Sequence, residues 1–339
     1  MKTAFISGIT GQDGSYLAEL LLDSDYFVVG LKRRTSLICT ERLNHIYDHK
    51  NFRMEYWDLN DSGSTYRLLL EYKPAEFYNL AAQSHVRVSF DVPEDTVNGI
   101  VLGTTRILEA IRHVLPDCRF YQASSSEMFG ENPDIPEAGY NENSRLMPAS
   151  PYACAKVFAH NLVRNYRASY GLYASSGILF NHESPRRGET FVTRKITLAA
   201  ANIRLGNQTH IELGNLAAKR DWGHAKDYVK AMHLMLQQNK PDDYVIATGE
   251  AHSVEEFLHE VWKHAGLGDP KQHLRINKKY FRPQEVPHLL GDSSKAQKVL
   301  DWSPQYNLSS LAKDMYDGDY NKIVMQQMHS RQVGQLCQK

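Results

Sequence analysis

The sequence has 339 residues, of which 42% are hydrophobic, so the chain can bury a large core in one big α/β domain or two smaller ones. Lysine plus arginine and aspartate plus glutamate are equal at 39 each, which excludes a strong overall field favouring nucleic acid or a membrane. The sequence shows neither a signal-peptide pattern nor an apolar run of membrane-spanning length. We therefore expect a cytoplasmic protein.

The four cysteines are far apart in the sequence and form no C-x-x-C pair, which predicts reduced thiols that serve as small apolar filler. They are Cys39, Cys118, Cys154 and Cys337. The fifteen histidines have neither ligand spacing nor a cysteine partner, so no metal site is expected.

A glycine-rich turn follows the first predicted strand, residues 3–7, and leads into an amphipathic helix. The spacing is Gly8-x-x-Gly11-x-x-Gly14, one residue longer than the common dehydrogenase pattern. Gly8 permits a tight turn, Gly11 lets backbone amides approach a pyrophosphate, and Gly14 lets the helix pack close to the sheet. The context of strand, turn and helix therefore predicts a dinucleotide site, with a plain tight turn as the alternative.

The second predicted strand, residues 27–31, ends in a cluster of cations and hydroxyls, residues 32–36. A site selective for NAD would place a carboxylate here, whereas this cluster suits a 2′-phosphate and favours NADP. The alternative is a solvated basic turn.

The next elements alternate in the same way. Strands are expected at 52–57, 76–80 and 119–123, with helices near 64–71 and 94–114. Each strand ends in small or polar residues, among them Asp58, a candidate acceptor from the adenine amine, and Ala81-Ala82, whose backbone could lie under the ribose. This order predicts a doubly wound parallel sheet (Rossmann-like), which binds ligands at the carboxyl ends of its strands.

The candidate catalytic groups come from two stretches. The strand at 119–123 ends in a hydroxyl-rich loop that contains Glu127, and a helix starts near Pro151. Tyr152 and Lys156 are four residues apart and share one face of that helix, whereas Cys154 has a different phase and is interpreted as packing. An ammonium beside a phenol would lower the pKa of the phenol and make it a base for hydride-transfer chemistry. The alternative is a solvated helix face.

The second half predicts a smaller, discontinuous C-terminal α/β domain that binds substrate. Helices are expected at 190–205, 224–238 and 309–328, strands at 210–213 and 244–247, and a capping box of Ser253 and Glu256 opens a helix that ends at Gly266. The NADP-binding domain is predicted at 1–180, with returns at about 224–250 and 286–300. The substrate domain takes 181–223, 251–285 and 301–330.

Three long motifs carry a resemblance to a known family: residues 8–17, 181–188 and 219–228. From about residue 2 to 328, the chain resembles the extended short-chain dehydrogenase/reductases, and within them the GDP-mannose 4,6-dehydratases. The resemblance implies a lyase that uses NADP to convert GDP-D-mannose to GDP-4-keto-6-deoxy-D-mannose. It also implies a homodimer or homotetramer.

The resemblance implies roles for matching positions. Tyr152 and Lys156 would form the redox pair, Ser125 the hydroxyl partner, and Glu127 the base. The implied cofactor-binding residues are Gly8, Thr10, Gly11, Gln12, Asp13, Gly14, Arg33, Ser36, Asp58, Leu59, Leu80, Ala81, Ala82, Ser84, Tyr152, Lys156, His182 and Arg187. The implied substrate-binding residues are Ser84, Ser126, Asn181, Lys195, Gly214, Arg220, Arg282 and Glu285.

Some positions depart from the family pattern, and some alternatives stay open. Ser125 stands where the family usually has Thr, and Asp95 stands where it often has a Tyr. The adjacent Asp-Glu pair of dTDP-glucose 4,6-dehydratases is Ser126-Glu127 here, so a single carboxylate would serve as both base and acid. The alternatives are another nucleotide-sugar dehydratase or 4-epimerase, a secondary 4-reductase activity giving a GDP-6-deoxyhexose, and a non-catalytic NADP-binding protein.

Overall fold

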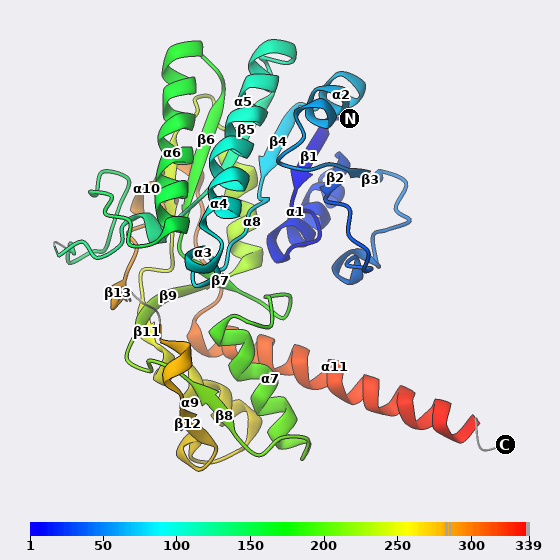
Figure 1. The fold of residues 1–339 in the computed structure, drawn as a ribbon, viewed down its shortest axis with the longest axis vertical. Coiled ribbons are helices and arrows are strands. Elements are labelled where there is room, and N and C mark those ends of the chain that lie inside the picture. Colours follow the sequence, from blue (N-terminus) through cyan, green and yellow to red (C-terminus); the bar gives the residue numbers. More distant parts are fainter. Residues whose placement is uncertain (134, 282–283, 285, 337–339) are drawn as a thin grey trace.

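The structure is a computed structural model that describes residues 1–133, 135–281, 284 and 286–336. Its main layer is a parallel sheet of seven strands in the order β10-β6-β5-β4-β1-β2-β3 (Figure 1). In chain order these are β1 Thr3–Ser7, β2 Phe27–Lys32, β3 Phe52–Tyr56, β4 Glu76–Asn79, β5 Arg119–Ser125, β6 Ala174–Leu179 and β10 Asp243–Ile246. The predicted doubly wound parallel sheet is confirmed.

Helices cover both faces of this sheet, and the inner strands β1, β4, β5 and β6 are therefore buried on both faces. One face carries α1 Gln12–Asp23, α8 Ala225–Gln237 and α10 Ser294–Leu300. The other carries α2 Ser62–Tyr72, α5 Gly103–Val114 and α6 Pro151–Tyr170. Leu17, Leu21 and Met232 fill the first core, and Ile107, Ile111 and Val163 fill the second.

The second half builds a smaller lobe below the sheet (Figure 1). Its strands are β7 Asn181–Glu183, β8 Ile211–Leu213, β9 Lys219–His224, β11 Ala251–Ser253, β12 Leu274–Ile276 and β13 His288–Leu289. Its helices are α7 Val192–Arg204, α9 Val254–Ala265 and α11 Leu308–Leu336, which pack around Trp222, Phe257 and Trp262. The domain boundaries proposed from the sequence stay a prediction.

The expected helix at 94–114 is confirmed, but it contains a π-helical turn and a further short helix precedes it. The chain forms α3 Val88–Asp91, α4 Pro93–Val97, a π-helical turn Asn98–Leu102 and then α5. Gly103 begins α5 against Leu59, where a Cβ would lie 2.6 Å from a Leu59 methyl. Short 3-10 turns lie at Glu41–Leu43, Ser126–Met128, Pro270–Gln272 and Lys278–Tyr280.

Helix ends in the second half follow the local signals. The capping box of Ser253 and Glu256 is confirmed, and Gly266 ends α9 in the left-handed conformation with φ of 65°. The last helix extends well past the expected end at 328, since α11 continues to Leu336.

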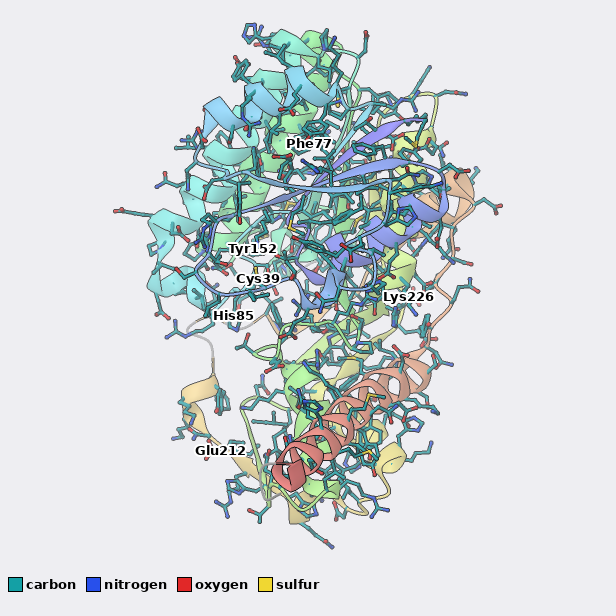
Figure 2. The ribbon with its side chains drawn as sticks, turned by 90° about the vertical axis from the view of Figure 1, so that its right-hand side faces the viewer. Cys39, Phe77, His85, Tyr152, Glu212 and Lys226 are labelled. Carbon is teal, nitrogen blue, oxygen red and sulfur yellow. The ribbon has the colours of Figure 1, made fainter. Side chains whose placement is uncertain are left out.

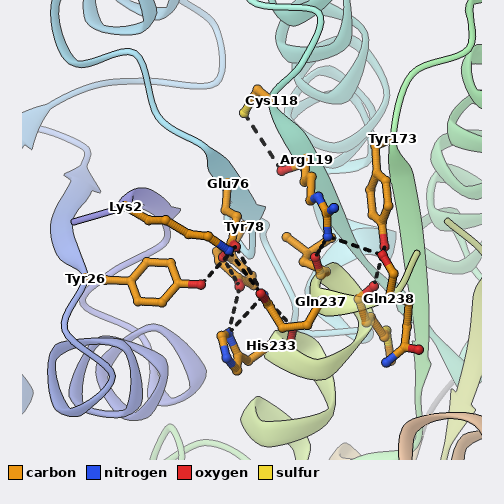
Figure 3. Close-up of polar contacts among 12 residues, drawn as sticks. Lys2, Tyr26, Glu76, Tyr78, Cys118, Arg119, Tyr173, His233, Gln237 and Gln238 are labelled. Carbon is orange, nitrogen blue, oxygen red and sulfur yellow. Dashed lines mark hydrogen bonds and ion pairs between the residues drawn. The ribbon is translucent and has the colours of Figure 1, made fainter. Parts of the chain in front are cut away.

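A buried carboxylate accepts several hydrogen bonds at the amino end of the central strand β4 (Figure 3). Glu76 is 1% exposed and accepts hydrogen bonds from the hydroxyls of Tyr26 at 3.0 Å and Tyr78 at 2.8 Å. Lys2 at 3.3 Å and Gln237 at 3.1 Å donate to the same group. This network is at the opposite end of the strands from the loops that carry the candidate site.

A buried ion pair fixes α11 to α7. Arg194 is 4% exposed and Asp319 is 0% exposed, and the Arg194 Nε lies 2.7 and 2.9 Å from the two Asp319 oxygens. Thr197 donates to the same carboxylate at 2.6 Å. Arg194 Nη1 also donates to the carbonyl of Arg187 at 2.8 Å, so the pair supports the loop that follows β7.

Replacing Asp319 by Asn is expected to lower the free energy of unfolding by about 3–5 kcal/mol, because the Arg194 charge stays buried without its counterion. Chemical denaturation monitored by circular dichroism measures the change. The control is Asp317→Asn, because Asp317 pairs with Lys313 on the surface and its loss should cost at most about 1 kcal/mol. Equal effects of the two changes would contradict the assigned role.

The cysteines only partly match their expected role. Cys118 is buried and Cys39 is half-buried, but Cys154 is exposed, so its interpretation as packing is wrong. Its helical phase turns it away from Tyr152, and at that position α6 faces outward. Cys337 lies outside the described residues.

Candidate active site

One cavity of about 650 Å³ lies where the carboxyl ends of the large sheet meet the smaller lobe. Figure 2 places Tyr152 and His85 between Phe77 in the sheet core and Glu212 in the smaller lobe. Both Tyr152 and His85 line the cavity, together with residues of β5, β7, β8 and β9. The cavity is therefore at the position expected for ligands of a doubly wound sheet.

The glycine turn forms one end of this cavity, and it fits a dinucleotide. Gly8 has φ of 69°, and a Cβ on Gly14 would lie 2.5 Å from the Gly8 carbonyl oxygen. Gly11 precedes the first residue of α1, so the amides at this helix start face the cavity side of the turn. A helix start without side chains in the way is suited to a pyrophosphate.

The candidate catalytic residues line the middle of the cavity. Ser150 caps α6 by accepting from the Ala153 amide at 3.1 Å, which fixes the start of the helix that carries Tyr152 and Lys156. Both side chains are buried, at 7% and 5% exposed. Glu127, 8% exposed, follows β5 in a 3-10 turn and lines the same cavity.

The prediction that Lys156 lowers the pKa of the Tyr152 phenol is wrong for the protein without bound ligands. Burial raises the pKa of Tyr152 to about 12, although a hydrogen bond with Ser125 lowers it, and the Glu127 charge raises it further. Burial also lowers the pKa of Lys156 to about 8. Lys156 Nζ donates to the Ala123 carbonyl at 2.7 Å and lies 5.6 Å from the centre of the Tyr152 ring.

The pKa of Lys156 gives an expected pH dependence. Its ammonium is present below about pH 8 and is lost above it, so turnover should decline as pH rises through 8. The measurement is kcat/KM against pH, which reports groups of the free enzyme. Lys156→Arg keeps its charge at these pH values and should lack this alkaline limb, whatever its absolute rate. A wild-type profile that stays flat above pH 8 would contradict the role.

Most of the predicted cofactor residues are brought together, but four are not. The cavity lining includes Gly8, Thr10, Gly11, Gln12, Asp13, Gly14, Leu80, Ala81, Ala82, Ser84, Tyr152, Lys156, His182 and Arg187. Arg33, Ser36, Asp58 and Leu59 lie outside this lining. Arg33 and Ser36 are exposed on the loop after β2, and Asp58 accepts from the Asn60 amide at 2.9 Å. Their cofactor contacts stay a prediction.

Sequence reasoning missed two arginines at this end of the cavity. Arg42 donates to the carbonyls of Thr10 at 3.1 Å and Arg186 at 2.9 Å, and its burial lowers its pKa. Arg186 pairs with Glu19 at 2.6 Å and lies 4.0 Å from the centre of the Tyr16 ring. The adjacent Arg186-Arg187 could have suggested a pair, whereas nothing in the sequence connected Arg42 with the glycine turn.

The predicted substrate residues gather at the other end. Ser84, Ser126, Asn181, Lys195, Gly214 and Arg220 all line the cavity. Lys195 Nζ lies 3.4 Å from the centre of the Tyr280 ring and donates to the Glu212 carbonyl. Tyr280 and its neighbour Lys279 also line the cavity and were missed. Arg282 and Glu285 lie outside the described residues.

Two carboxylates close to Arg220 in the sequence, Asp221 and Asp227, have other hydrogen-bond partners. The Asp221 carboxylate accepts from the amides of Thr248 at 2.8 Å and Gly249 at 2.9 Å. Asp227 accepts from the amide of Gln305 at 2.8 Å. Both carboxylates thus hold loops of the backbone, while Arg220, 6% exposed, lines the cavity.

Two negative observations concern only the part of the chain that is described. None of its helices is both long enough and apolar enough to cross a bilayer. None of its clusters of His, Cys, Asp and Glu side chains would hold a metal ion.

Comparisons with known proteins agree with this geometry. Two solved structures share the fold over nearly the whole chain. The dTDP-glucose 4,6-dehydratase of Bacillus anthracis in complex with NAD has a TM-score of 0.83 at 20% identity, covering 95% of this chain and 97% of that one. The UDP-glucose 4-epimerase of Thermotoga maritima has a TM-score of 0.82 at 22% identity, covering 95% and 99%. At these identities the two structures show the fold alone, a Rossmann-like parallel sheet joined to a smaller lobe.

The sequence comparisons are more specific. The family described as GDP-mannose 4,6 dehydratase matches residues 5–315. GDP-mannose 4,6 dehydratase 1 of Arabidopsis thaliana is 53% identical over 328 residues, covering 94% of this chain and 90% of that protein. The GDP-mannose 4,6 dehydratase of Drosophila melanogaster is 51% identical over 342 residues, covering 94% and 86%. The chain belongs to the GDP-mannose 4,6-dehydratase family.

Proposed function

We propose that the chain binds GDP-D-mannose and NADP in the cavity and converts the sugar to GDP-4-keto-6-deoxy-D-mannose with loss of water. The observation that carries this proposal is the meeting of Tyr152, Lys156 and Glu127 in one buried cavity, between a glycine turn and a cluster of cations. An epimerase needs only the redox pair, whereas an elimination needs a base such as Glu127.

The redox step uses the groups on α6 and β5. Bound NADP would supply the hydride acceptor for carbon 4 of the sugar and, once reduced, the hydride donor for carbon 6. Tyr152 takes the proton of the carbon-4 hydroxyl, and Ser125, which hydrogen bonds to the phenol, orients that hydroxyl. Burial raises the pKa of Tyr152, so positive charge must stabilise the phenolate. The charge of Arg187 acts in this direction, and the Lys156 ammonium would add to it.

The elimination step uses Glu127. A ketone at carbon 4 acidifies the proton on carbon 5, which the Glu127 carboxylate removes. The protonated Glu127 then supplies a proton to the carbon-6 hydroxyl, which leaves as water. Hydride addition at carbon 6 of the resulting enone is completed by a proton at carbon 5, and this proton balances the one that Tyr152 took from the carbon-4 hydroxyl. Ser126 stands where a second acid would be, so one carboxylate performs both transfers.

At the substrate end, cations from the smaller lobe would bind the diphosphate. Arg220 offers the planar donor geometry that suits phosphate oxygens, and Lys195 offers a point charge. We propose that Arg282 and Glu285 contact the same substrate. We further propose a cytoplasmic location and a homodimer or homotetramer.

The test is incubation of the protein and NADP with GDP-mannose, dTDP-glucose and UDP-glucose, with mass spectrometry of the products. GDP-mannose alone should lose one water, without added reductant. With deuterium at carbon 4 of GDP-mannose, the label should be found at carbon 6. Water loss from another sugar nucleotide instead, or epimerisation without water loss, would overturn the proposal.

A further inference from the structure

Both ring nitrogens of His182 are already bonded within the protein. His182 is in β7, is 8% exposed and lines the cavity. Its Nδ1 lies 2.8 Å from the Phe180 carbonyl oxygen, and its Nε2 lies 2.8 Å from Asp13 Oδ2. A carbonyl and a carboxylate only accept hydrogen bonds, so both nitrogens must donate, and the ring that makes both bonds is an imidazolium.

These contacts belong to a larger junction between the glycine turn and β7. Gln12 Nε2 donates to the His182 carbonyl at 3.0 Å and to Asp13 Oδ1 at 3.0 Å. Ser184 donates to Gln12 Oε1 at 2.7 Å. Since β7 pairs with β9, the junction joins the turn that would bind the cofactor to the sheet of the smaller lobe.

The groups around the His182 ring come from three elements. Asp13 faces it from α1, Arg187 from the loop after β7, and the Tyr228 ring of α8 stacks on it at 4.5 Å between centroids. Burial alone would lower the pKa of His182, but the Asp13 charge and hydrogen bond raise it above its ordinary value, and Arg187 opposes them. Burial alone would raise the pKa of Asp13, but His182 lowers it.

The Asp13 charge also acts on the catalytic pair. Burial is the largest influence on the pKa of both Tyr152 and Lys156, but Asp13 lines the same cavity and its charge raises the pKa of each. A positive His182 beside Asp13 offsets part of this effect. The two opposite charges are hydrogen-bonded to each other, so their fields largely cancel at groups that lie farther away. The state of His182 therefore bears on the site without a contact between its ring and the reacting groups.

We propose that His182 is a positioning residue held as an imidazolium, whose ion pair with Asp13 joins the glycine turn to β7 and shields the Tyr152–Lys156 pair from the Asp13 charge. This role rests on the proposed function and replaces a direct ring contact with the cofactor. Loss of the proton at alkaline pH breaks one of the two ring hydrogen bonds and loosens the junction.

The protonation state is tested on the full chain without cofactor or substrate. With ¹⁵N-labelled histidine, the signal lost in His182→Gln should show two protonated ring nitrogens at neutral pH. The free energy of unfolding should contain a contribution that is full below about pH 6.5 and is lost as pH rises through the folded pKa, because that pKa is raised. His182→Gln should lack this pH-dependent contribution. A neutral ring at neutral pH, or identical pH dependence of unfolding in both proteins, would overturn the proposal.

The joining role is tested by NADP affinity in a double-mutant cycle. His182→Gln and Asp13→Asn should each weaken NADP binding about tenfold, and the double variant no more than about tenfold, because the two side chains act as one unit. Two independent cofactor contacts would instead multiply to about hundredfold and overturn the proposal. His113→Gln is the control, because His113 pairs with Glu109 on the surface at 3.4 Å and should leave affinity unchanged.

The shielding role is tested by the alkaline limb of the pH profile. In His182→Gln the limb assigned to Lys156 should move to higher pH, because the unpaired Asp13 charge stabilises the ammonium more strongly. Adding Asp13→Asn should reverse this shift, and failure of that reversal would contradict the role. If the protein does not turn over GDP-mannose, the proposed function fails, while the histidine signals and the unfolding curves still decide the state of His182.

Discussion

Replacing Glu127 by Gln is expected to lower product formation by about 10²–10⁴-fold, because the amide can neither remove the carbon-5 proton nor deliver one to the leaving hydroxyl. Oxidation at carbon 4 does not need this carboxylate, so reduced cofactor should accumulate on the enzyme during a single turnover. The absorbance of reduced nicotinamide measures that accumulation, and mass spectrometry measures the missing water loss. Removing the negative charge near Tyr152 should also lower the pKa of the phenol.

The matched control for this change is Glu137→Gln. Glu137 is an exposed carboxylate on the loop between the 3-10 turn of Glu127 and α6, and its loss should leave turnover within about twofold of wild type. Unchanged product formation in Glu127→Gln would remove this carboxylate from the elimination. A loss of product without trapped reduced cofactor would place its role before the hydride transfer.

Replacing Tyr152 by Phe is expected to stop the reaction one step earlier. The phenyl ring fills the same buried space but cannot take the carbon-4 hydroxyl proton, so turnover should again decline by about 10²–10⁴-fold. No reduced cofactor should form in a single turnover, which distinguishes this variant from Glu127→Gln. The affinity for substrate, measured by calorimetry, should change by less than about tenfold because one hydrogen bond is lost.

Tyr170→Phe is the control on the same helix. Tyr170 ends α6 and is 50% exposed, far along the helix from the cavity, and its hydroxyl should be dispensable. Trapped reduced cofactor in Tyr152→Phe would contradict the assigned order of steps. Unfolding curves of both variants show whether any loss of turnover comes from the loss of folded protein.

Much of this fold could be predicted because its signals are local. The glycine turn, the short apolar strands and the polar residues at their ends follow from side-chain pattern and backbone freedom alone. Tyr152 and Lys156 share a helix, so their meeting needs only the helical repeat. Glu127 could be placed near them because the carboxyl ends of neighbouring parallel strands meet at one edge of a sheet.

The misses have a different origin, since each depends on contacts between distant segments. Arg42 reaches the glycine turn through the fold of the loop after β2, which the sequence pattern does not determine. Tyr280 meets Lys195 only because β12 pairs with β8. The sequence pattern predicts a lowered pKa for Tyr152 because it shows the neighbouring lysine but not the burial that outweighs it.

The ion pair between Arg194 and Asp319 has a consequence for how the protein responds to heat. Because Arg194 also supports the Arg187 carbonyl, warming that detaches the C-terminal helix would release the cavity wall at the same time. The affinity of the enzyme for its ligands should then fall at a temperature at which the large sheet is still folded. A bound sugar nucleotide would in turn protect α11 from proteolysis, because it holds the same loop through the cavity side.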